Sequence, residues 1–221
     1  MGLLYTILNM VFPEKCFVCG ETASELCLKC LSDAPGAERE SEEWIFPLYD
    51  YRHQIINRSI KLLKYKGRRR LAKVFAQALY GAILEELAER RIMDDFREAI
   101  LIPIPLSPKR RRSRGFNQAE LICKELVEIE KSNLRHGVDA NFVLKKNILI
   151  KYRDTPHQAD IKDRKERLKN IVGCFSAGSE AKGRNIILLD DVTTTGATLR
   201  EARKVLRRAG GRKIIAFTLA H

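Results

Sequence analysis

The chain of 221 residues is predicted to be an α/β protein, a parallel sheet flanked by helices, with a small cysteine module in front of it. Apolar runs of strand length alternate with helical patterns, which favours parallel strands joined by right-handed crossovers. Near the C-terminus a buried-strand pattern passes directly into two aspartates and a threonine-rich turn. Near the N-terminus four cysteines form two Cys-x2-Cys pairs. We therefore expect residues 1–43 to form an N-terminal unit and residues 44–221 to form the α/β domain.

The N-terminal unit is expected to contain a helix, a metal module and a linker. Residues 1–12 are apolar and predict a short helix, and they lack the basic start and the cleavage site of a signal peptide. Residues 13–31 hold the cysteine pairs, and residues 32–43 form a polar linker. No apolar run approaches the roughly 18 residues that span a bilayer. We therefore expect a cytoplasmic protein that does not insert into membranes.

The four cysteines have the spacing of a closed zinc site. Each Cys-x2-Cys pair supplies half of a tetrahedral set of ligands, and two pairs complete it. Disulfides are the weaker interpretation, because a cytoplasmic protein lives in a reducing compartment. Four thiolates leave no open coordination position, so the expected metal is structural zinc, bound by Cys16, Cys19, Cys27 and Cys30.

The first part of the α/β domain alternates between strand and helix patterns. In chain order we expect a strand at 44–51, helices at 55–64 and 71–87, a strand at 99–106, a helix at 119–129, and a short strand at 148–150. Pro103 and Pro105 interrupt the strand at 99–106, and a bulged edge strand is an equally good interpretation of this segment.

The C-terminal part contains the most specific motif of the chain. It begins with a strand at 171–177, then an apolar strand at 186–189 that runs into Asp190 and Asp191. A hydroxyl-rich turn at 193–198, a helix at 199–208 and a last strand at 214–219 follow. Backbone N–H groups of the turn and the start of the helix favour an anion, while two carboxylates can accept hydrogen bonds from two neighbouring sugar hydroxyls. The alternative is a plain strand-turn-helix with solvated carboxylates and an N-cap threonine.

The motif resembles the 5-phosphoribosyl diphosphate (PRPP) signature of type I phosphoribosyltransferases. The resemblance implies the type I phosphoribosyltransferase fold, in which N-terminal segments form a cap called the hood. It implies that Asp190 and Asp191 hold the ribose hydroxyls. It also implies that the 5-phosphate is bound by the turn, with a PRPP-binding segment of Val192, Thr193, Thr194, Thr195, Gly196, Ala197 and Thr198.

Four short motifs occur in a fixed order before and within this region. The first motif is Lys64-Tyr-Lys-Gly67, and the second is the proline-rich segment at 103–108 with Arg114-Gly-Phe-Asn-Gln118. The third consists of Arg153, Thr155, Gln158, Arg164 and Asn170. The aspartate motif is the last of the four. Together with the cysteine module, this order is similar to the ComF family of phosphoribosyltransferase-like proteins, which is associated with natural competence in bacteria. The family is defined by its role in DNA uptake, so the resemblance implies an enzyme fold without naming an acceptor.

The diphosphate of PRPP is expected at the carboxyl end of the strand at 99–106, because ligands of open α/β sheets bind there. The backbone N–H groups of Leu106 and Ser107, and the guanidinium of Arg114, are the candidate donors. Type I enzymes place a mobile loop between the strands at 148–150 and 171–177, so Arg153 and Arg164 are candidate catalytic groups over the diphosphate. A solvated helix beginning near residue 160 is the alternative. Mg²⁺ is expected to be held largely by substrate oxygens and water.

The formal net charge of +13 suits a polyanionic partner, either PRPP or nucleic acid. Charge alone does not choose between them, and a basic solvated surface explains it equally well. The leading hypothesis is a Mg²⁺-dependent phosphoribosyltransferase with an unknown acceptor. The rival hypothesis is a non-catalytic adaptor in DNA uptake that binds single-stranded DNA or a helicase and keeps the PRPP-site fold. Two arginine runs, at residues 68–70 and 110–112, are the sequence candidates for contacts with nucleic acid or phosphates, and a solvated basic face is the alternative.

Overall fold

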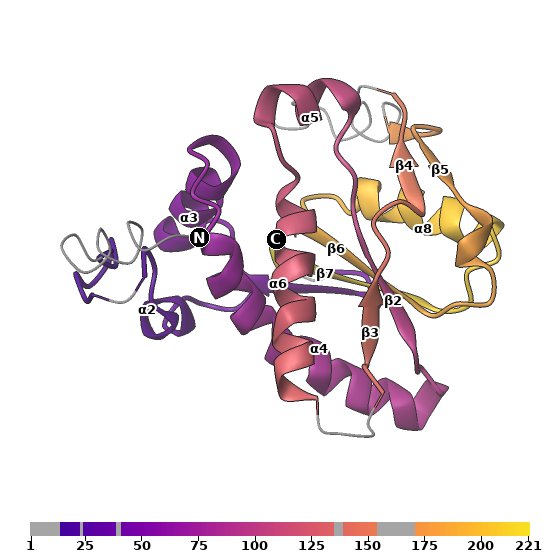
Figure 1. Ribbon diagram of the computed structural model, residues 1–221, viewed down its shortest axis with the longest axis horizontal. Coiled ribbons are helices and arrows are strands. Elements are labelled where there is room, and N and C mark those ends of the chain that lie inside the picture. Colours follow the sequence, from indigo (N-terminus) through magenta and orange to yellow (C-terminus); the bar gives the residue numbers. More distant parts are fainter. Residues whose placement is uncertain (1–13, 23, 39–40, 135–138, 154–170) are drawn as a thin grey trace.

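A computed structural model of the chain describes residues 14–22, 24–38, 41–134, 139–153 and 171–221 (Figure 1). Its centre is a five-stranded parallel sheet with the strand order β1-β7-β6-β2-β3. The strands are β1 (Ile45–Tyr49), β2 (Ala99–Pro103), β3 (Phe142–Leu144), β6 (Ile186–Val192) and β7 (Ile214–Ala220). A separate antiparallel ribbon joins β4 (Leu149–Lys151) to β5 (Phe175–Ala177). The parallel α/β prediction is therefore confirmed.

The helices cover both faces of the sheet. They are α2 (Leu28–Ser32), α3 (Gln54–Tyr65), α4 (Leu71–Asp94), α5 (Pro108–Arg114), α6 (Gln118–Asn133) and α8 (Ala197–Arg208), with a 3-10 turn, η1, at Ser179–Ala181. Figure 1 shows α4 and α6 on one side of the sheet, and α8 with the β4–β5 ribbon on the other. Among the described helices, none combines the length and the apolar character that crossing a lipid bilayer requires.

The central strand β6 separates two hydrophobic cores. Ile187 and Leu189 lie in the core that contains α4 and α6 side chains, whereas Ile186 and Leu188 lie in the core that contains α8 side chains. All four residues are fully buried, as expected for a strand of a parallel sheet that is covered on both faces. Successive residues of a strand point to opposite faces, and this alternation decides where the residues that follow Leu189 point.

The proline-containing strand differs from both sequence interpretations. Strand β2 ends at Pro103 rather than at residue 106, and it lies between β6 and β3, so the bulged edge strand is wrong. Pro103 is tolerated as the last residue because the next ladder hydrogen bond is donated by Ile104, whose N–H lies 2.8 Å from the carbonyl oxygen of Leu189. The chain then turns into α5, a short helix that the sequence patterns did not predict. It has no buried residue and is mostly basic, so it has no apolar stripe that would identify it.

Two other segments are shorter or more divided than predicted. The strand expected at 171–177 begins only at Phe175, because Ile171 is helical and Val172 and Gly173 form a turn. The region 142–152 contains two strands that join different sheets, β3 in the main sheet and β4 in the ribbon. The helix expected at 1–12 lies outside the described residues.

The cysteine module packs directly on the α/β domain. Leu26, Cys27 and Leu31 belong to the same buried cluster as Leu79 and Ile83 of α4. Two ion pairs tie the module to the turn between α3 and α4: Arg68 with Glu25, at 2.8 Å, and Arg70 with Glu14. The division at residue 43 stays a prediction.

Candidate functional site

Strand β6 carries the two predicted aspartates at its carboxyl end. The strand extends through Asp190 and Asp191 to Val192, three residues beyond the apolar run, and stays paired with β7. By strand alternation, Asp191 follows Ile187 and Leu189 towards the α3, α4 and α6 side, and Asp190 points towards the α8 side. Both side chains are half-buried. Two adjacent carboxylates are therefore presented at the edge of the sheet, one on each side of the strand.

Asp191 is engaged by a lysine from the N-terminal half of the chain. The Nζ atom of Lys64, near the end of α3, lies 2.8 Å from Oδ1 of Asp191, and both side chains are largely shielded from solvent. Burial alone would lower the pKa of the Lys64 ammonium group. The ion pair with Asp191, and the charge of Asp190, outweigh this effect and raise that pKa. Lys64 therefore stays charged at the carboxyl edge of the sheet.

Asp190 has an unusual acidity. Burial and the neighbouring charge of Asp191 raise the pKa of the Asp190 carboxyl to about 7, although the N–H of Asp191 and the charges of Lys64 and Lys151 act in the opposite direction. The N–H of Asp191 donates to Oδ1 of Asp190 over 2.9 Å. Lys151 is a buried residue of β4, on the same face of that strand as the buried Leu149. Asp190 therefore titrates near neutral pH, unlike an ordinary aspartate.

The turn after β6 is held in place by the last strand. The N–H of Thr193 donates to the carbonyl oxygen of Ala220 over 2.9 Å, and the ring Nε2 of His221 lies 3.0 Å from the carbonyl oxygen of Thr194. Gly196 has a φ of 69°, a left-handed conformation that favours glycine, and it precedes the first residue of α8. The structure therefore brings the acidic pair, the turn and the N-terminus of a helix together, as the sequence motif predicts. This arrangement can bind an anion next to a pair of hydroxyl groups.

The loop after β2 reaches the neighbouring part of the same edge, because β2 is hydrogen-bonded to β6. Leu106 is half-buried and Ser107 is 1% exposed. The Oγ atom of Ser107 is buried without a hydrogen-bond partner among the described residues. Asn117 holds the start of this loop, because its side-chain amide donates to the carbonyl oxygen of Ile104 over 2.9 Å. An unpartnered buried hydroxyl here is consistent with a polar ligand at this loop.

Arg114 lies close to α3. Its guanidinium carbon is 5.1 Å from the ring centroid of Tyr65, and its Nη1 atom donates to Oε1 of Gln118 over 2.8 Å. A pocket of about 380 Å³ lies between α3 and α5, and it is lined by Lys64, Tyr65, Gly67, Arg110, Ser113, Arg114 and Phe116. Lys64 lines this pocket together with Arg114 and also contacts Asp191. Arg114 and the acidic pair therefore share Lys64 as a common neighbour.

The predicted loop residues are only partly placed. Strands β4 and β5 pair antiparallel, and residues 154–170 between them, where the mobile loop is predicted, lie outside the described residues. Arg153 is exposed, with its guanidinium carbon 5.9 Å from the ring centroid of Tyr152. Thr155, Gln158, Arg164 and Asn170 lie outside the described residues.

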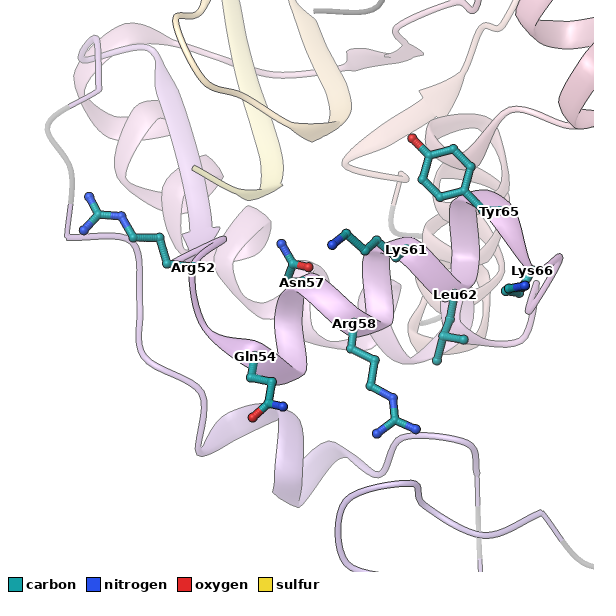
Figure 2. Close-up of a pocket in the computed structure, with 8 residues that line it drawn as sticks. All are labelled: Arg52, Gln54, Asn57, Arg58, Lys61, Leu62, Tyr65 and Lys66. Carbon is teal, nitrogen blue, oxygen red and sulfur yellow. The ribbon is translucent and has the colours of Figure 1, made fainter. Parts of the chain in front are cut away.

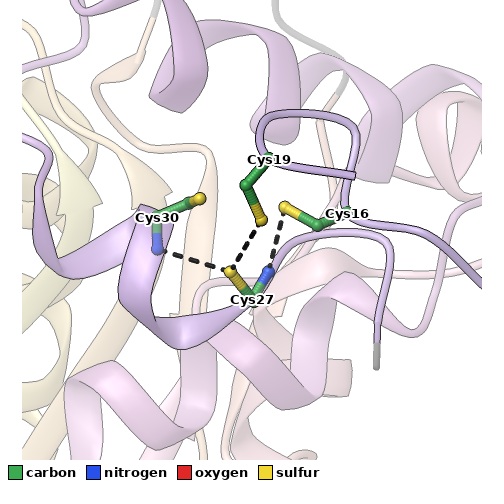
Figure 3. A group of neighbouring side chains, drawn as sticks. All are labelled: Cys16, Cys19, Cys27 and Cys30. Atoms are coloured by element: carbon green, nitrogen blue, oxygen red, sulfur yellow. Dashed lines mark hydrogen bonds between the residues drawn. The ribbon is translucent and has the colours of Figure 1, made fainter. Parts of the chain in front are cut away.

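The four predicted metal ligands form one cluster (Figure 3). The Sγ atoms of Cys16, Cys19, Cys27 and Cys30 all lie within 4.8 Å of one another. The Sγ atoms of Cys19 and Cys27 are 3.7 Å apart, close to the separation of about 3.8 Å that tetrahedral Zn–S bonds of about 2.3 Å require. Although burial opposes it, backbone N–H groups lower the pKa of the Cys16 thiol to about 6, which favours a thiolate. The cluster can therefore hold a metal ion.

A second basic surface lies along α3 (Figure 2). A groove of about 660 Å³ is lined by Arg52, Gln54, Asn57, Arg58, Lys61, Leu62, Tyr65 and Lys66. Arg58 of this groove lies over the ring of Phe17, and the basic run after α3 is likewise partly engaged in contacts within the protein. Arg68 and Arg70 pair with glutamates of the cysteine module, and Arg69 lies over the ring of Phe116.

Comparisons with known proteins agree with this geometry. A model of the phosphoribosyl transferase domain matches residues 134–221, which include β6, the acidic pair and α8. Competence protein F of Haemophilus influenzae is 31% identical over 211 residues, an alignment that covers 91% of this chain and 83% of that protein. The chain belongs to the ComF family. The type I phosphoribosyltransferase fold predicted from the sequence is therefore confirmed.

Other ComF relatives have names that refer to DNA utilization or to competence. The DNA utilization protein YhgH of Shigella flexneri is 30% identical, over 92% of this chain and 82% of that protein. Competence protein ComFC of Streptococcus pneumoniae is 33% identical, over 71% of this chain and 59% of that protein. The names link relatives of this ComF chain to competence, and none of them states a chemical reaction.

Two residues of the candidate site were undervalued or missed in the sequence of this ComF protein. The sequence offers two interpretations of Lys64, Tyr65 and Lys66: cations that offset the dipole at a helix end, or groups that reach the active site from the hood. The contact of Lys64 with Asp191 depends on where α3 packs. In the sequence, Lys151 is only a charged residue at the end of a short apolar run, and no motif marks it as part of a site. Both lie outside any local pattern that includes the aspartates, so only the folded chain connects them to the acidic pair.

Proposed function

We propose that this protein binds PRPP and transfers its phosphoribosyl group to an acceptor in a Mg²⁺-dependent reaction. The observation that carries the proposal is the pair Asp190 and Asp191 at the end of β6, followed by a threonine turn and the N-terminus of α8. A site that bound phosphate alone would not need two carboxylates next to the turn. The phosphoribosyl transferase domain match over this region supports the same function.

In this proposal the ribose, the 5-phosphate and the diphosphate of PRPP bind to different segments at the carboxyl edge of the sheet. The ribose hydroxyls donate to Asp190 and Asp191. The 5-phosphate accepts hydrogen bonds from the turn at 193–198, where the positive end of the α8 dipole adds attraction. Backbone N–H and hydroxyl groups of the turn are the proposed donors to the phosphate. The hydrogen bond from Thr193 to Ala220 and the left-handed backbone of Gly196 give the turn its shape.

The diphosphate is assigned to the loop after β2. The backbone N–H groups of Leu106 and Ser107 and the guanidinium of Arg114 are the proposed donors, with Arg153 and Arg164 as further cations. Breaking the bond between C1 and diphosphate leaves negative charge on the leaving group, which fixed positive groups stabilise. Mg²⁺, held largely by diphosphate oxygens and water, supplies further neutralisation of that charge. The unpartnered hydroxyl of Ser107 supports a ligand at this loop.

The cysteine cluster is proposed to hold structural zinc. Four thiolates fill all positions of a tetrahedral ion, so the ion has no position for substrate or water. The cluster lies against α4 in the hydrophobic core. Its proposed role is therefore to stabilise the packing of the N-terminal segments on the α/β domain.

Isothermal titration calorimetry with PRPP and Mg²⁺ tests the proposal directly. We expect saturable binding, and weaker binding of ribose-5-phosphate, because it lacks the diphosphate contacts. A screen of acceptor bases and amines, with PRPP hydrolysis as a first assay, then tests transfer. Protein that melts cooperatively but shows no heat of PRPP binding would contradict the assignment of the site.

A second candidate function is favoured by the groove on α3. Four of its lining residues are cationic, and the exposed Tyr65 lies at the C-terminal end of α3, at one end of the groove (Figure 2). Positive groups next to an exposed aromatic ring suit single-stranded nucleic acid, whose phosphates and bases they can contact together. In this candidate function the protein is an adaptor for single-stranded DNA in DNA uptake, with or without a helicase partner.

Fluorescence anisotropy with a labelled single-stranded oligonucleotide tests this surface. Changing Arg58, Lys61 and Lys66 together to alanine should weaken DNA binding and lower the slope of affinity against salt by about 2. PRPP affinity should not change. The matched control changes Lys73, Lys131 and Lys182 to alanine, which removes the same charge elsewhere. Equal losses in both triple variants would indicate unspecific attraction and exclude the α3 surface.

A further inference from the structure

The acidic pair lies beside two lysines that come from opposite sides of the sheet. Lys64 belongs to α3, whose buried residues share a core with α4 and α6. Lys151 belongs to β4, whose buried Leu149 shares a core with α8. The charges of both lysines act on Asp190, and Lys64 is also bonded to Asp191. A strand end with two negative charges is therefore opposed by two positive charges.

Asp190 and Asp191 each use one carboxylate oxygen, Oδ1, for a contact within the protein. Oδ1 of Asp191 accepts from Lys64, and Oδ1 of Asp190 accepts from the N–H of Asp191. Among the described residues, neither Oδ2 atom takes part in a hydrogen bond or ion pair. Each carboxylate is thus held by one oxygen and keeps the other for a ligand. Two free oxygens on adjacent carboxylates match two neighbouring hydroxyl groups.

We propose that Lys64 is a positioning residue for the diol of the sugar. Its ammonium group holds Asp191 by Oδ1 and supplies positive charge to the pair, so that Oδ2 of each aspartate accepts from one ribose hydroxyl. This inference rests on the proposed function, since it names how the same site recognises ribose. Lys64 acts through the carboxylates and does not contact the reacting bond.

The same geometry makes the contribution of Lys64 measurable through Asp190. The charged groups that face Asp190 are Asp191 on its own strand, Lys64 from α3 and Lys151 from β4. Tyr51, from the turn before α3, acts on Lys64. Among the described cations that act on Asp190, removing the Lys64 charge leaves only Lys151. Protonation of Asp190 then persists to higher pH, and a protonated carboxyl is a poorer acceptor for a hydroxyl.

The test combines carboxyl ¹³C NMR titration of the ligand-free protein with calorimetry of PRPP and Mg²⁺ between about pH 6 and pH 9. Lys64→Met removes the charge and keeps most of the apolar stem. We expect the Asp190 midpoint to rise by about one pH unit and PRPP affinity at pH 7 to fall roughly tenfold. The loss should be smaller at pH 9. Lys64→Arg keeps the charge and should restore the midpoint.

The controls separate this role from a structural one. Lys73→Met removes an exposed lysine of α4 and should leave the midpoint and the affinity unchanged. If Lys64→Met does not fold, Lys64→Gln keeps a hydrogen-bond donor without the charge and should give the same shift. The 5-phosphate of PRPP itself titrates near pH 6, so only differences between proteins at equal pH are interpreted.

Three results decide the inference. An Asp190 midpoint that does not move in Lys64→Met overturns it. So does an affinity loss that is equal at every pH and is not restored by arginine, because that is the signature of a merely structural contact. A midpoint that moves as expected in a protein that binds no PRPP supports the charge role of Lys64 and refutes the proposed function.

Discussion

The cysteine cluster and the acidic pair are both dense groups of like side chains, but they are assembled in different ways. Cys16, Cys19, Cys27 and Cys30 come from one short segment, and their Sγ atoms converge within 4.8 Å. Asp190 and Asp191 are adjacent in sequence, yet the groups that balance their charge come from α3 and β4. The first site is complete within a local loop, whereas the second depends on the packing of the whole domain.

This difference has a chemical consequence. Four thiolates around a metal close the site, so its contribution is to stability. The acidic pair has its charge partly compensated, and within the described part of the chain each carboxylate keeps one oxygen without a partner, so it can still bind a ligand. A site of local origin is therefore suited to a structural role, and a site assembled from distant elements is suited to recognition.

The largest expected effect concerns the local site. Cys27→Ser should abolish metal binding, because the module loses a ligand whose Sγ atom lies 3.7 Å from that of Cys19. Structural zinc in small modules contributes about 10 kcal/mol or more of binding free energy, which is coupled to folding. Elemental analysis and hydrogen exchange measure the result. We expect zinc in the wild-type protein, and fast exchange over residues 14–34 with protection of β6 and β7 retained in the variant.

Absence of zinc from wild-type protein prepared without chelators would contradict this prediction. If β6 and β7 also lost their protection from hydrogen exchange, the cysteine cluster and the acidic pair would not be independent of each other. The contrast between a local site and an assembled site would then be wrong.

The next effect concerns the assembled site. Asp190→Asn combined with Asp191→Asn should weaken PRPP binding roughly 10²–10⁴-fold, because two charge-assisted hydrogen bonds of about 1.5–3 kcal/mol each are lost. Calorimetry measures the affinity, and zinc content serves as the control, since the cysteine cluster should be unaffected. Undiminished affinity in a folded double variant would show that the pair does not bind the sugar.

A smaller effect is expected at Arg153. Arg153→Ala should lower PRPP turnover or hydrolysis several-fold, with little change in DNA affinity, because the side chain is assigned to the diphosphate. The exposed position of Arg153 makes a loss of stability negligible. Steady-state assays and anisotropy measure the two activities on one protein sample. The reverse result, with lost DNA binding and intact turnover, would favour the adaptor function.

The smallest effect is on stability. The pKa of Asp190 is about 7 in the folded protein and about 3.9 in an unfolded chain. Between these values the folded protein holds a proton that the unfolded chain has released, so stability falls as pH rises from about 4 to about 7. Asp190→Asn removes this cost. It should raise Tm at pH 8, by about 2–4 °C for each kcal/mol, and have little effect at pH 4.

Scanning calorimetry at both pH values measures the change. An Asn variant that is less stable at pH 8 would mean that the Asp190 carboxylate is stabilised by its neighbours, against the direction of its pKa.

Much of the fold was predictable because it depends on local patterns. The apolar run before Asp190, the helical pattern after Gly196 and the strand at Ile214–Ala220 were placed within a few residues of their observed bounds. The position of β2 inside the sheet was not predictable from Pro103. Pro103 has no N–H, and the next hydrogen bond to β6 is donated by Ile104 instead. This depends on the register between β2 and β6. Helix α5 was missed because its side chains are solvated and have no apolar period.

The sequence by itself determined the sheet and helix alternation, the cysteine ligand set and the aspartate motif, because each depends on spacing within one segment. Only the tertiary structure decided that Lys64 bonds to Asp191, that Lys151 lies within electrostatic reach of Asp190, and that Arg114 lies next to Tyr65. The physical reason is that charge and hydrogen bonding depend on distance through space. Strand order and helix packing set those distances, and neither can be obtained from the spacing of residues along the chain.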